Sequence, residues 1–404
     1  MSDNAAVFPY QSPPAWEQRK LGQHLKLSRE LGHTGVDARK LTVKLWGKGV
    51  VEKTDLYGGS AQTQYYIRHA GQFMYGKLDF LHAAFGVVPD KLDCFESTLD
   101  SPAFDIEGLD SSFLLNLVTQ EDFYLKNGNI ANGSRKAKRI HEETFLNMEI
   151  RAPELVEQRQ IGAFFDRLDS LITLHQRKYD KLCVLKKTML DKMFPKGGSL
   201  YPEIRFAGFT DPWEQRKLED YVVVSTAKNV DGRFNKEDVL SVSGEYGIVN
   251  QIAFQGRSFA GSSVLNYGIV NTGDIVYTKS PLNSNPYGII KVNKGIPGIV
   301  STLYAVYRPQ DNVHTNFIQV YFEQHERMNN YMHPLVNKGA KNDMKVTAEN
   351  ALKGVVTFPS REEQVIISEF FDRLDSLITL HQRKYCGVVS WMLGVALVRL
   401  SSEK

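Results

Sequence analysis

A stretch of sixteen residues occurs twice in this chain without a single change. FFDRLDSLITLHQRKY runs from Phe164 to Tyr179 and again from Phe370 to Tyr385. The hexapeptide WEQRKL is likewise found at Trp16–Leu21 and at Trp213–Leu218. Because identity of this length does not arise by chance, the repeat has to be considered before any local pattern. It predicts a chain of two related halves that arose by tandem duplication.

Weaker matches follow in the same order between these two anchors. GQFMYGK from Gly71 to Lys77 corresponds to GDIVYTK from Gly273 to Lys279, and Pro153 corresponds to Pro359. The first part of each half is rich in Gly and Asn, with short β-branched and aromatic runs that are typical of strands separated by turns. We therefore predict a mixed α/β domain at 1–152 and a second one at 197–358.

The second part of each half is predicted to be a long helix. From Glu154 to about Met193 glycine occurs only at Gly162, and Pro195 ends the segment. A helix of this length spans about 60 Å at about 1.5 Å per residue. We assign the central helix to 153–196 and the distal helix to 359–404. The predicted fold class is α+β, with two globular mixed α/β domains separated by two long antiparallel helices in pseudo-two-fold symmetry.

Apolar residues in both helical parts recur at alternating steps of four and three residues, which is the seam of a coiled coil. The residues expected to pair the helices are Ile161, Phe165, Leu168, Ile172 and Leu182 with Ile367, Phe371, Leu374 and Ile378. The alternative is that each helix packs on its own domain. His175 and His381 interrupt the seam, and such polar residues can fix the register of paired helices.

Charge and cysteine content limit the function classes. The net charge is only +3, so any basic surface for a polyanion has to be local. Cys94, Cys183 and Cys386 are far apart and form no Cys/His cluster, which argues against a zinc site and fits a reducing cytoplasm. No signal peptide or membrane span is expected. The sequence predicts no catalytic, cofactor-binding or metal-binding residues.

The order of these motifs resembles the specificity subunit of type I DNA restriction–modification systems. The resemblance rests on WEQRKL, the Pro-xxx-Glu-Gln motif that begins at Pro153 and Pro359, the FDRLDSLITLHQRK repeat and the MFPK that ends the first helix. It covers nearly the whole chain. It implies that each globular part is a target recognition domain that reads one half of a split DNA sequence, and that the helices set the unread gap.

The resemblance also implies partners. Two adenine-N6 methyltransferase subunits would dock on the chain, and two motor-nuclease subunits would join for restriction. The methyl donor and ATP would be bound by those partners, so no cofactor is expected here. In agreement, the sequence has no GxxxxGK[ST] phosphate loop, and Asn285-Pro-Tyr and Asp211-Pro-Trp each lack the second proline of an adenine methyltransferase motif.

Two basic loops at matching positions are the first candidates for contact with double-stranded DNA. The first carries Arg135, Lys136, Lys138 and Arg139, and the second carries Lys338, Lys341, Asn342 and Lys345. A Gly/Asn-rich loop can approach a groove closely, and Arg, Lys and Asn can bind base edges or phosphates. A solvated surface loop is the alternative.

A second paired feature has two interpretations that the sequence does not separate. Tyr75 with Lys77, and Tyr277 with Lys279, lie at the end of a predicted strand. They could present a stacking ring and a phosphate contact to DNA. They could equally be a structural tyrosine and a lysine whose stem lies along apolar surface.

After Tyr385 the distal helix becomes apolar on nearly every face, which favours an altered gene end over a terminal helix buried against a partner. Two other function classes are a coiled-coil adaptor with protein-binding ends and an enzyme that acts alone. The adaptor predicts no salt-dependent DNA binding, and the enzyme predicts methylation of DNA by the purified chain.

Overall fold

The computed structural model describes residues 16–54, 60–129, 139–261, 263–279, 285–338 and 344–401, without the side chains of 337, 338, 344, 345, 386 and 388–401. The five loop residues Arg135, Lys136, Lys138, Lys341 and Asn342 lie outside this description. The chain divides into two compact units, Met1–Thr173 and Leu174–Lys404.

The first unit is built on small antiparallel sheets. A four-stranded sheet has the order β2-β10-β7-β8, a three-stranded sheet has the order β3-β6-β9, and β1-β11 and β4-β5 form pairs. The strands are β1 (Glu17–Lys20), β2 (Leu25–Ser28), β3 (Leu31–Thr34), β4 (Leu41–Val43), β5 (Val50–Glu52), β6 (Gln64–Arg68), β7 (Phe73–Tyr75), β8 (Phe85–Val87), β9 (Phe95–Ser97), β10 (Ala103–Ile106) and β11 (Glu149–Ala152). The helices are α1 (Ser111–Val118), α2 (Glu121–Gly128) and α3 (Glu142–Leu146), with 3-10 turns η1 (Leu21–Gln23), η2 (Phe80–His82) and η3 (Asp90–Leu92).

An aromatic cluster forms the main core of this unit. Phe73 stacks on Phe145 with ring centroids 5.8 Å apart, and Tyr75 lies 4.5 Å from the same ring. Every residue of β7 is buried, so this strand is covered on both faces. Burial of such rings is a large share of the hydrophobic stabilisation of a domain of this size.

The second unit also contains a four-stranded antiparallel sheet together with strand pairs. Its four-stranded sheet has the order β13-β20-β17-β18, and β12-β23, β14-β15, β16-β19 and β21-β22 form pairs. The strands are β12 (Glu214–Lys217), β13 (Val222–Val224), β14 (Leu240–Ser243), β15 (Gly247–Asn250), β16 (Gly268–Val270), β17 (Ile275–Tyr277), β18 (Ile290–Val292), β19 (Gly298–Val300), β20 (Ala305–Pro309), β21 (Asn337–Lys338), β22 (Met344–Lys345) and β23 (Val355–Phe358). The helices are α5 (Gln251–Gln255), α6 (Thr315–Glu323) and α7 (His325–Met332), with 3-10 turns η4 (Leu218–Asp220), η5 (Lys236–Asp238), η6 (His333–Leu335) and η7 (Asn350–Leu352).

Matching contacts extend to single hydrogen bonds. The residues EQRK of the repeated WEQRKL motif form β1 in one unit and β12 in the other, and each strand pairs antiparallel with the strand that precedes a long helix. The last residue of the motif donates its amide to a backbone carbonyl, from Leu21 to Met148 O at 2.9 Å and from Leu218 to Gly354 O at 3.0 Å. The same sequence therefore closes each domain at the point where its helix begins.

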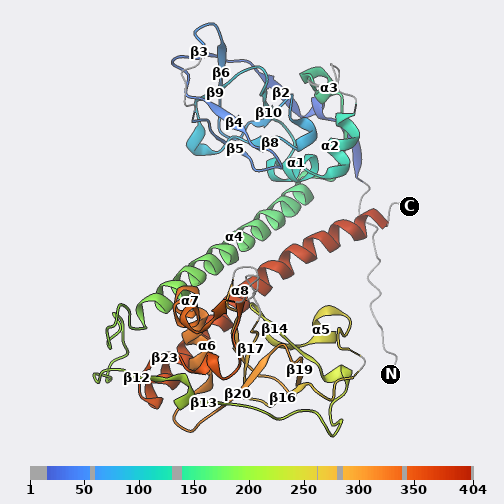
Figure 1. Cartoon of the computed structure of the whole chain (residues 1–404). Coiled ribbons are helices and arrows are strands. Elements are labelled where there is room, and N and C mark those ends of the chain that lie inside the picture. Colours follow the sequence, from blue (N-terminus) through green and yellow to red (C-terminus); the bar gives the residue numbers. More distant parts are fainter. Residues whose placement is uncertain are drawn as a thin grey trace, which may run out of the picture. The chain divides into compact units, whose positions relative to one another are not determined.

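The two longest helices are α4 (Leu155–Lys192) and α8 (Arg361–Ser401), drawn in green and red in Figure 1. Each begins two residues after a proline, because the residue before a proline disfavours helical geometry and the proline itself suits the approach to the first turn. α8 continues to Ser401 in spite of Gly387 and Gly394.

Sheets and helices occur together as the α+β prediction requires. Within the described residues, none of the helices is both long enough and apolar enough to cross a membrane.

Candidate functional site

The start of each long helix is fixed to its domain by a glutamine of the Pro-xxx-Glu-Gln motif. Gln158 Nε2 donates to Pro153 O at 2.8 Å, and Gln158 Oε1 accepts from the amide of Asp110 at 3.0 Å. In the second unit Gln364 Nε2 donates to Pro359 O at 3.0 Å, and its Oε1 accepts from the amide of His314 at 2.9 Å. Both glutamines are buried. The motif therefore sets the direction in which each helix leaves its domain.

Replacing Gln158 by alanine is expected to lower the free energy of unfolding by about 1 to 3 kcal/mol, because the partly buried amide of Asp110 loses its partner. Thermal unfolding of the full chain measures this. Gln160→Ala, on an exposed position of the same helix turn, is the matched control and should change little. Equal stability of the two variants would show that the glutamine does not hold the junction.

Two equivalent residues of the repeat meet within the second unit. The Nδ1 atoms of His175 and His381 lie 2.9 Å apart and their ring centroids 5.2 Å apart. One imidazole has to donate and the other accept. The contact joins the same position of the two copies of the sixteen-residue repeat. The register function predicted for these histidines is compatible with this contact but is not tested by it.

A second contact gives the direction of the two helices at this place. Lys186 Nζ lies 2.6 Å from Asp375 Oδ1 and 2.8 Å from Glu323 Oε1 of α6. Lys186 follows His175 in α4, whereas Asp375 precedes His381 in α8, so the described segments run antiparallel. Burial opposes the charge of Lys186, but the two carboxylates outweigh it and raise the pKa of this lysine.

The histidine contact predicts a pH dependence. Partial burial lowers the pKa of His381 below its usual 6.5, and the positive charges of His175, Lys178 and Lys384 act in the same direction. Below about pH 6.5 the unfolded chain therefore binds more protons at this histidine than the folded chain does. The contribution of His381 to the free energy of unfolding is present above that pH and is lost as the pH falls below it. We expect the melting temperature to fall between about pH 7.5 and pH 5.5 by more in the wild type than in His381→Gln. An equal fall in both proteins would contradict this expectation.

Three of the predicted seam residues of α8 are buried. Ile367, Phe371 and Leu374 are at most 5% exposed and share one core with Leu190, Met193 and Phe194, at and just beyond the end of α4. Leu182 packs at the edge of the same core. That core also contains Phe317 and Tyr321 of α6, so helix pairing and packing on the domain, which the sequence posed as alternatives, occur together here.

Ile161 packs against the core of the first unit, near the Gln158 contacts that hold the start of α4. Its assignment as a pairing residue stays a prediction. Phe165, Leu168, Ile172 and Ile378 are half-buried, and their assignment as pairing residues stays a prediction.

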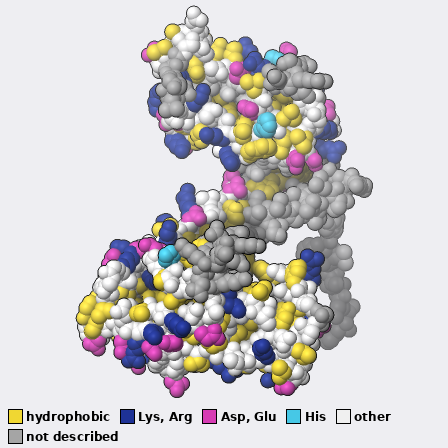
Figure 2. Space-filling view, viewed as in Figure 1, with side chains coloured by type: hydrophobic (Ala, Val, Ile, Leu, Met, Phe, Trp, Pro, Cys, Tyr) yellow, Lys and Arg dark blue, Asp and Glu magenta, His cyan; other side chains and the backbone are white. Residues whose placement is uncertain are grey.

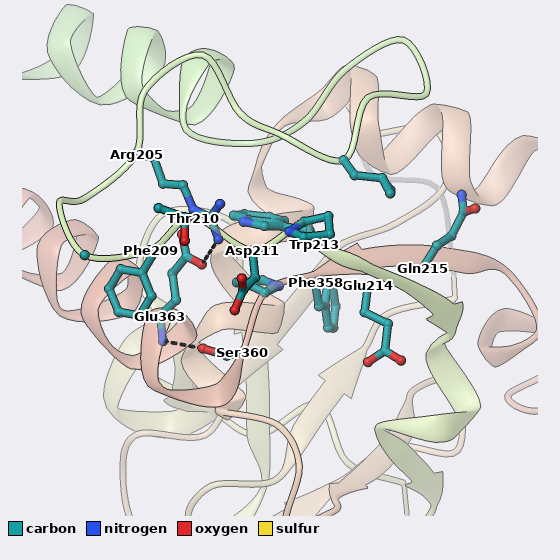
Figure 3. Close-up of a pocket in the computed structure, with 14 residues that line it drawn as sticks. Arg205, Phe209, Thr210, Asp211, Trp213, Glu214, Gln215, Phe358, Ser360 and Glu363 are labelled. Atoms are coloured by element: carbon teal, nitrogen blue, oxygen red, sulfur yellow. Dashed lines mark hydrogen bonds and ion pairs between the residues drawn. The ribbon is translucent and has the colours of Figure 1, made fainter.

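A cavity of about 590 Å³ lies where α8 begins (Figure 3). Arg205 lines it and binds Glu363 through two hydrogen bonds, from Nε at 2.8 Å and from a terminal guanidinium nitrogen at 2.7 Å. Trp213 forms part of the wall and is 1% exposed. The charges of Arg205 and Glu363 are thus paired with each other. The cavity is therefore a structural junction between the segment after α4 and the start of α8.

Of the two basic loops, the structure describes only Arg139 in the first and the backbone of Lys338 and Lys345 in the second. Arg139 is exposed, with its guanidinium 3.6 Å from Asp100. Lys338 and Lys345 belong to the β21-β22 pair, in which Asn337 faces Lys345 and Lys338 faces Met344. The assignment of both loops to DNA contact therefore stays a prediction.

The tyrosine and lysine pairs are corrected to structural residues where the structure describes them. Tyr75 is fully buried and donates to Ile140 O at 2.9 Å, and Tyr277 is 1% exposed and donates to Tyr287 O at 2.8 Å. Neither ring has a face on which a base could stack. Lys77 is 7% exposed and pairs with Glu142 at 2.8 Å, while Lys279 Nζ donates to Thr302 O at 3.0 Å. The strands that carry the tyrosines are covered on both faces, which the sequence alternation did not indicate.

Surface charge is mixed on the face of each unit seen in Figure 2, where Lys and Arg side chains are interspersed with Asp and Glu. This distribution agrees with the small net charge of +3. A contact surface for a polyanion would have to be short and local on such a molecule.

Comparison with known proteins gives a consistent picture. The chain is 25% identical over 123 residues to the type I restriction enzyme MjaVIII specificity subunit of Methanocaldococcus jannaschii, a match that covers 30% of this chain and 28% of that relative. No family model matches the sequence. The type I restriction–modification S subunit of M. genitalium has the same fold, with a TM-score of 0.54 and 10% identity over 95% of both chains.

The chain resembles type I specificity subunits. The HsdS subunit of Thermoanaerobacter tengcongensis also aligns over 93% of both chains, at 16% identity and a TM-score of 0.43. The matched segment of the curated relative is a little over a quarter of its length, whereas the structural match to the M. genitalium subunit spans nearly the whole chain. The likeness to the M. genitalium subunit shows a shared fold.

Proposed function

We propose that this chain is the non-catalytic DNA-recognition subunit of a type I restriction–modification complex in the cytoplasm. Its two globular domains, 1–152 and 197–358, each read one half of a split target in double-stranded DNA. The helices pair antiparallel as a coiled coil and hold the two domains at a set distance. The tandem duplication supplies two positions at which the same partner subunit can dock.

The observation that carries this proposal is the contact of His175 with His381 at 2.9 Å. Residues at the same place in the two repeats meet each other, as expected if a local two-fold axis relates the helices. The two helices share sixteen identical residues, which suggests that they have the same role, whereas the two domains differ in sequence and length. Two unlike reading domains on one symmetric spacer suit a target with two unlike halves.

The partners follow from the same arrangement. Two adenine-N6 methyltransferase subunits would bind the two equivalent surfaces, and two motor-nuclease subunits would join them for cleavage. The methyl donor and ATP would be bound by these partners, and the chain itself would hold no cofactor. DNA contact would come from Arg135, Lys136, Lys138 and Arg139 and from the loop between β21 and β22.

Sequencing that detects N6-methyladenine in a host genome, with and without this gene, tests the proposal. The expected result is one interrupted motif that is methylated only when the gene is present. Unchanged methylation would favour the adaptor, which binds protein and not DNA. Methylation of DNA by the purified chain alone, given the methyl donor, would make it an enzyme.

Changing Arg135 and Lys136 together to alanine is expected to weaken binding to the target and to reduce the slope of log affinity against log salt by about two, because each phosphate contact contributes about 0.9 to that slope. Titration of the complex with labelled target DNA at several salt concentrations measures both quantities. Lys91→Ala with Lys126→Ala, on exposed positions of the same unit, serves as the charge-matched control. Unchanged affinity and slope would show that this loop does not touch DNA.

A further inference from the structure

The topology of the three-stranded sheet brings together four polar residues that are distant in sequence. β6 is the central strand and pairs antiparallel with both β3 and β9. The start of β3, the end of β6 and the start of β9 therefore lie at one edge of the sheet. Glu30 immediately precedes β3, His69 immediately follows β6, and Asp93 and Cys94 immediately precede β9.

Their side chains form one connected cluster. His69 Nδ1 lies 3.3 Å from Asp93 Oδ1, and Cys94 Sγ lies 3.4 Å from Asp93 Oδ2. The other ring nitrogen of His69, Nε2, lies 2.8 Å from Glu30 Oε2. A nitrogen, an oxygen and a sulfur of His69, Asp93 and Cys94 all fall within 4.8 Å of one another.

The backbone holds this arrangement in place. The amide of Ala70 donates to Asp93 Oδ1 at 2.9 Å, and the amide of Cys94 donates to Arg68 O at 2.9 Å. Cys94 also has a φ of +61°, a conformation that side chains other than glycine adopt at a cost. The loop thus keeps the thiol beside the histidine and the carboxylate instead of relaxing to an ordinary turn.

The donors match the set that zinc prefers. Zinc binds imidazole nitrogen and carboxylate oxygen at about 2.0 to 2.2 Å and thiolate sulfur at about 2.3 Å, which puts neighbouring donors roughly 3.3 to 3.7 Å apart. Two contacts have this length, 3.3 Å from His69 Nδ1 to Asp93 Oδ1 and 3.4 Å from Cys94 Sγ to the other carboxylate oxygen, Oδ2, and the three donors lie within 4.8 Å of one another. A carboxylate on the remaining ring nitrogen is the usual way in which a metal-binding histidine is oriented, and Glu30 occupies that place.

We propose that His69, Asp93 and Cys94 form a zinc-class divalent cation site, with Glu30 as the residue that positions His69. Solvent fills the fourth place, since all three ligand residues are partly or fully exposed. On binding, the thiol of Cys94 gives its proton to solvent and its sulfur takes the metal. The cation joins the ends of three strands and so stiffens one edge of the first domain. This proposal is independent of the proposed function and departs from the sequence prediction of no metal site, which rested on the wide spacing of the cysteines.

Titration of the purified full chain with zinc, followed by calorimetry, tests the site. We expect one zinc per chain and a rise in melting temperature with zinc concentration, because a ligand that binds only the folded state stabilises it. Cobalt in place of zinc should give the absorption band of a thiolate ligand. Cys94→Ser and His69→Gln should abolish both signals, and Glu30→Gln should weaken zinc binding by about 10- to 100-fold.

Two further variants keep the outcome clear. Cys183→Ser removes the half-buried thiol of α4 and should leave zinc binding unchanged. Cys94→Gly relieves the backbone conformation, so it should fold at least as well as the wild type while losing the metal. If the wild type takes up no zinc in a fixed ratio, or if Cys94→Ser binds it as tightly, the cluster is a surface hydrogen-bond network only and the proposal is wrong.

Discussion

Arg205→Ala is expected to lower the free energy of unfolding of the second unit by about 3 to 5 kcal/mol, since it removes one partner of a buried ion pair. Glu363 is 1% exposed on its side chain and Arg205 is 15% exposed. Without the guanidinium, the carboxylate has to lose its charge or draw water into the junction at the start of α8. Chemical denaturation of the full chain, monitored by the fluorescence of its tryptophans, measures the loss.

A matched variant separates this effect from the loss of any arginine. Arg216 pairs with Glu214 at 2.6 Å, but their side chains are 46% and 60% exposed. Arg216→Ala should therefore cost at most about 1 kcal/mol. The double variant Arg205→Ala, Glu363→Gln should recover part of the stability, because no unpaired buried charge remains. A loss below about 1 kcal/mol for Arg205→Ala would show that the pair does not hold the junction.

Insertion of one heptad at the centre of both helices is expected to lengthen the unread gap of the DNA target. Duplicating LITLHQR at 171–177 and at 377–383 adds seven residues to each helix next to the histidine contact. The seam keeps its period, and the helices grow by about 10.5 Å. This length corresponds to about three base pairs, so the two half-motifs should stay the same while the gap grows by that number.

We expect the complex with the doubly extended variant to methylate its DNA target less than the wild-type complex does. Three base pairs also turn the groove by about 100°, and DNA or helices must absorb that turn by bending or twisting. Sequencing of N6-methyladenine in cells that carry the variant reads both half-motifs and the gap. Insertion into one helix alone puts the seams out of register and should abolish modification. A wild-type gap in the doubly extended variant would mean that the helices do not set it.

Sequence reasoning was most successful where a local pattern determines the structure. The helix expected from Glu154 to about Met193 is observed at Leu155–Lys192, because Pro153 and Pro195 mark its two ends in the sequence. Strand runs such as Ile275–Tyr277 were also recognisable from their β-branched and aromatic residues. The period of the seam agrees with the burial of Phe371 and Leu374.

Features that depend on residues far apart in sequence could not be predicted in this way. Tyr75 and Tyr277 are buried because both faces of their strands are covered, and a three-residue run does not reveal the second layer. Arg205 meets Glu363 from 158 positions away, and His69 meets Cys94 through the order of strands in a sheet. Such contacts require the topology, which periodicity and composition do not supply.

A distance measurement between the two reading domains tests the central claim most directly. Spin labels on cysteines placed at the exposed Glu121 and Glu326, with Cys94, Cys183 and Cys386 replaced by serine, would report it by pulsed electron resonance. If paired helices hold the domains at a set separation, the full chain gives one narrow distance distribution, and the double heptad insertion moves it to longer distance. A broad distribution that the insertion leaves unchanged would contradict the account.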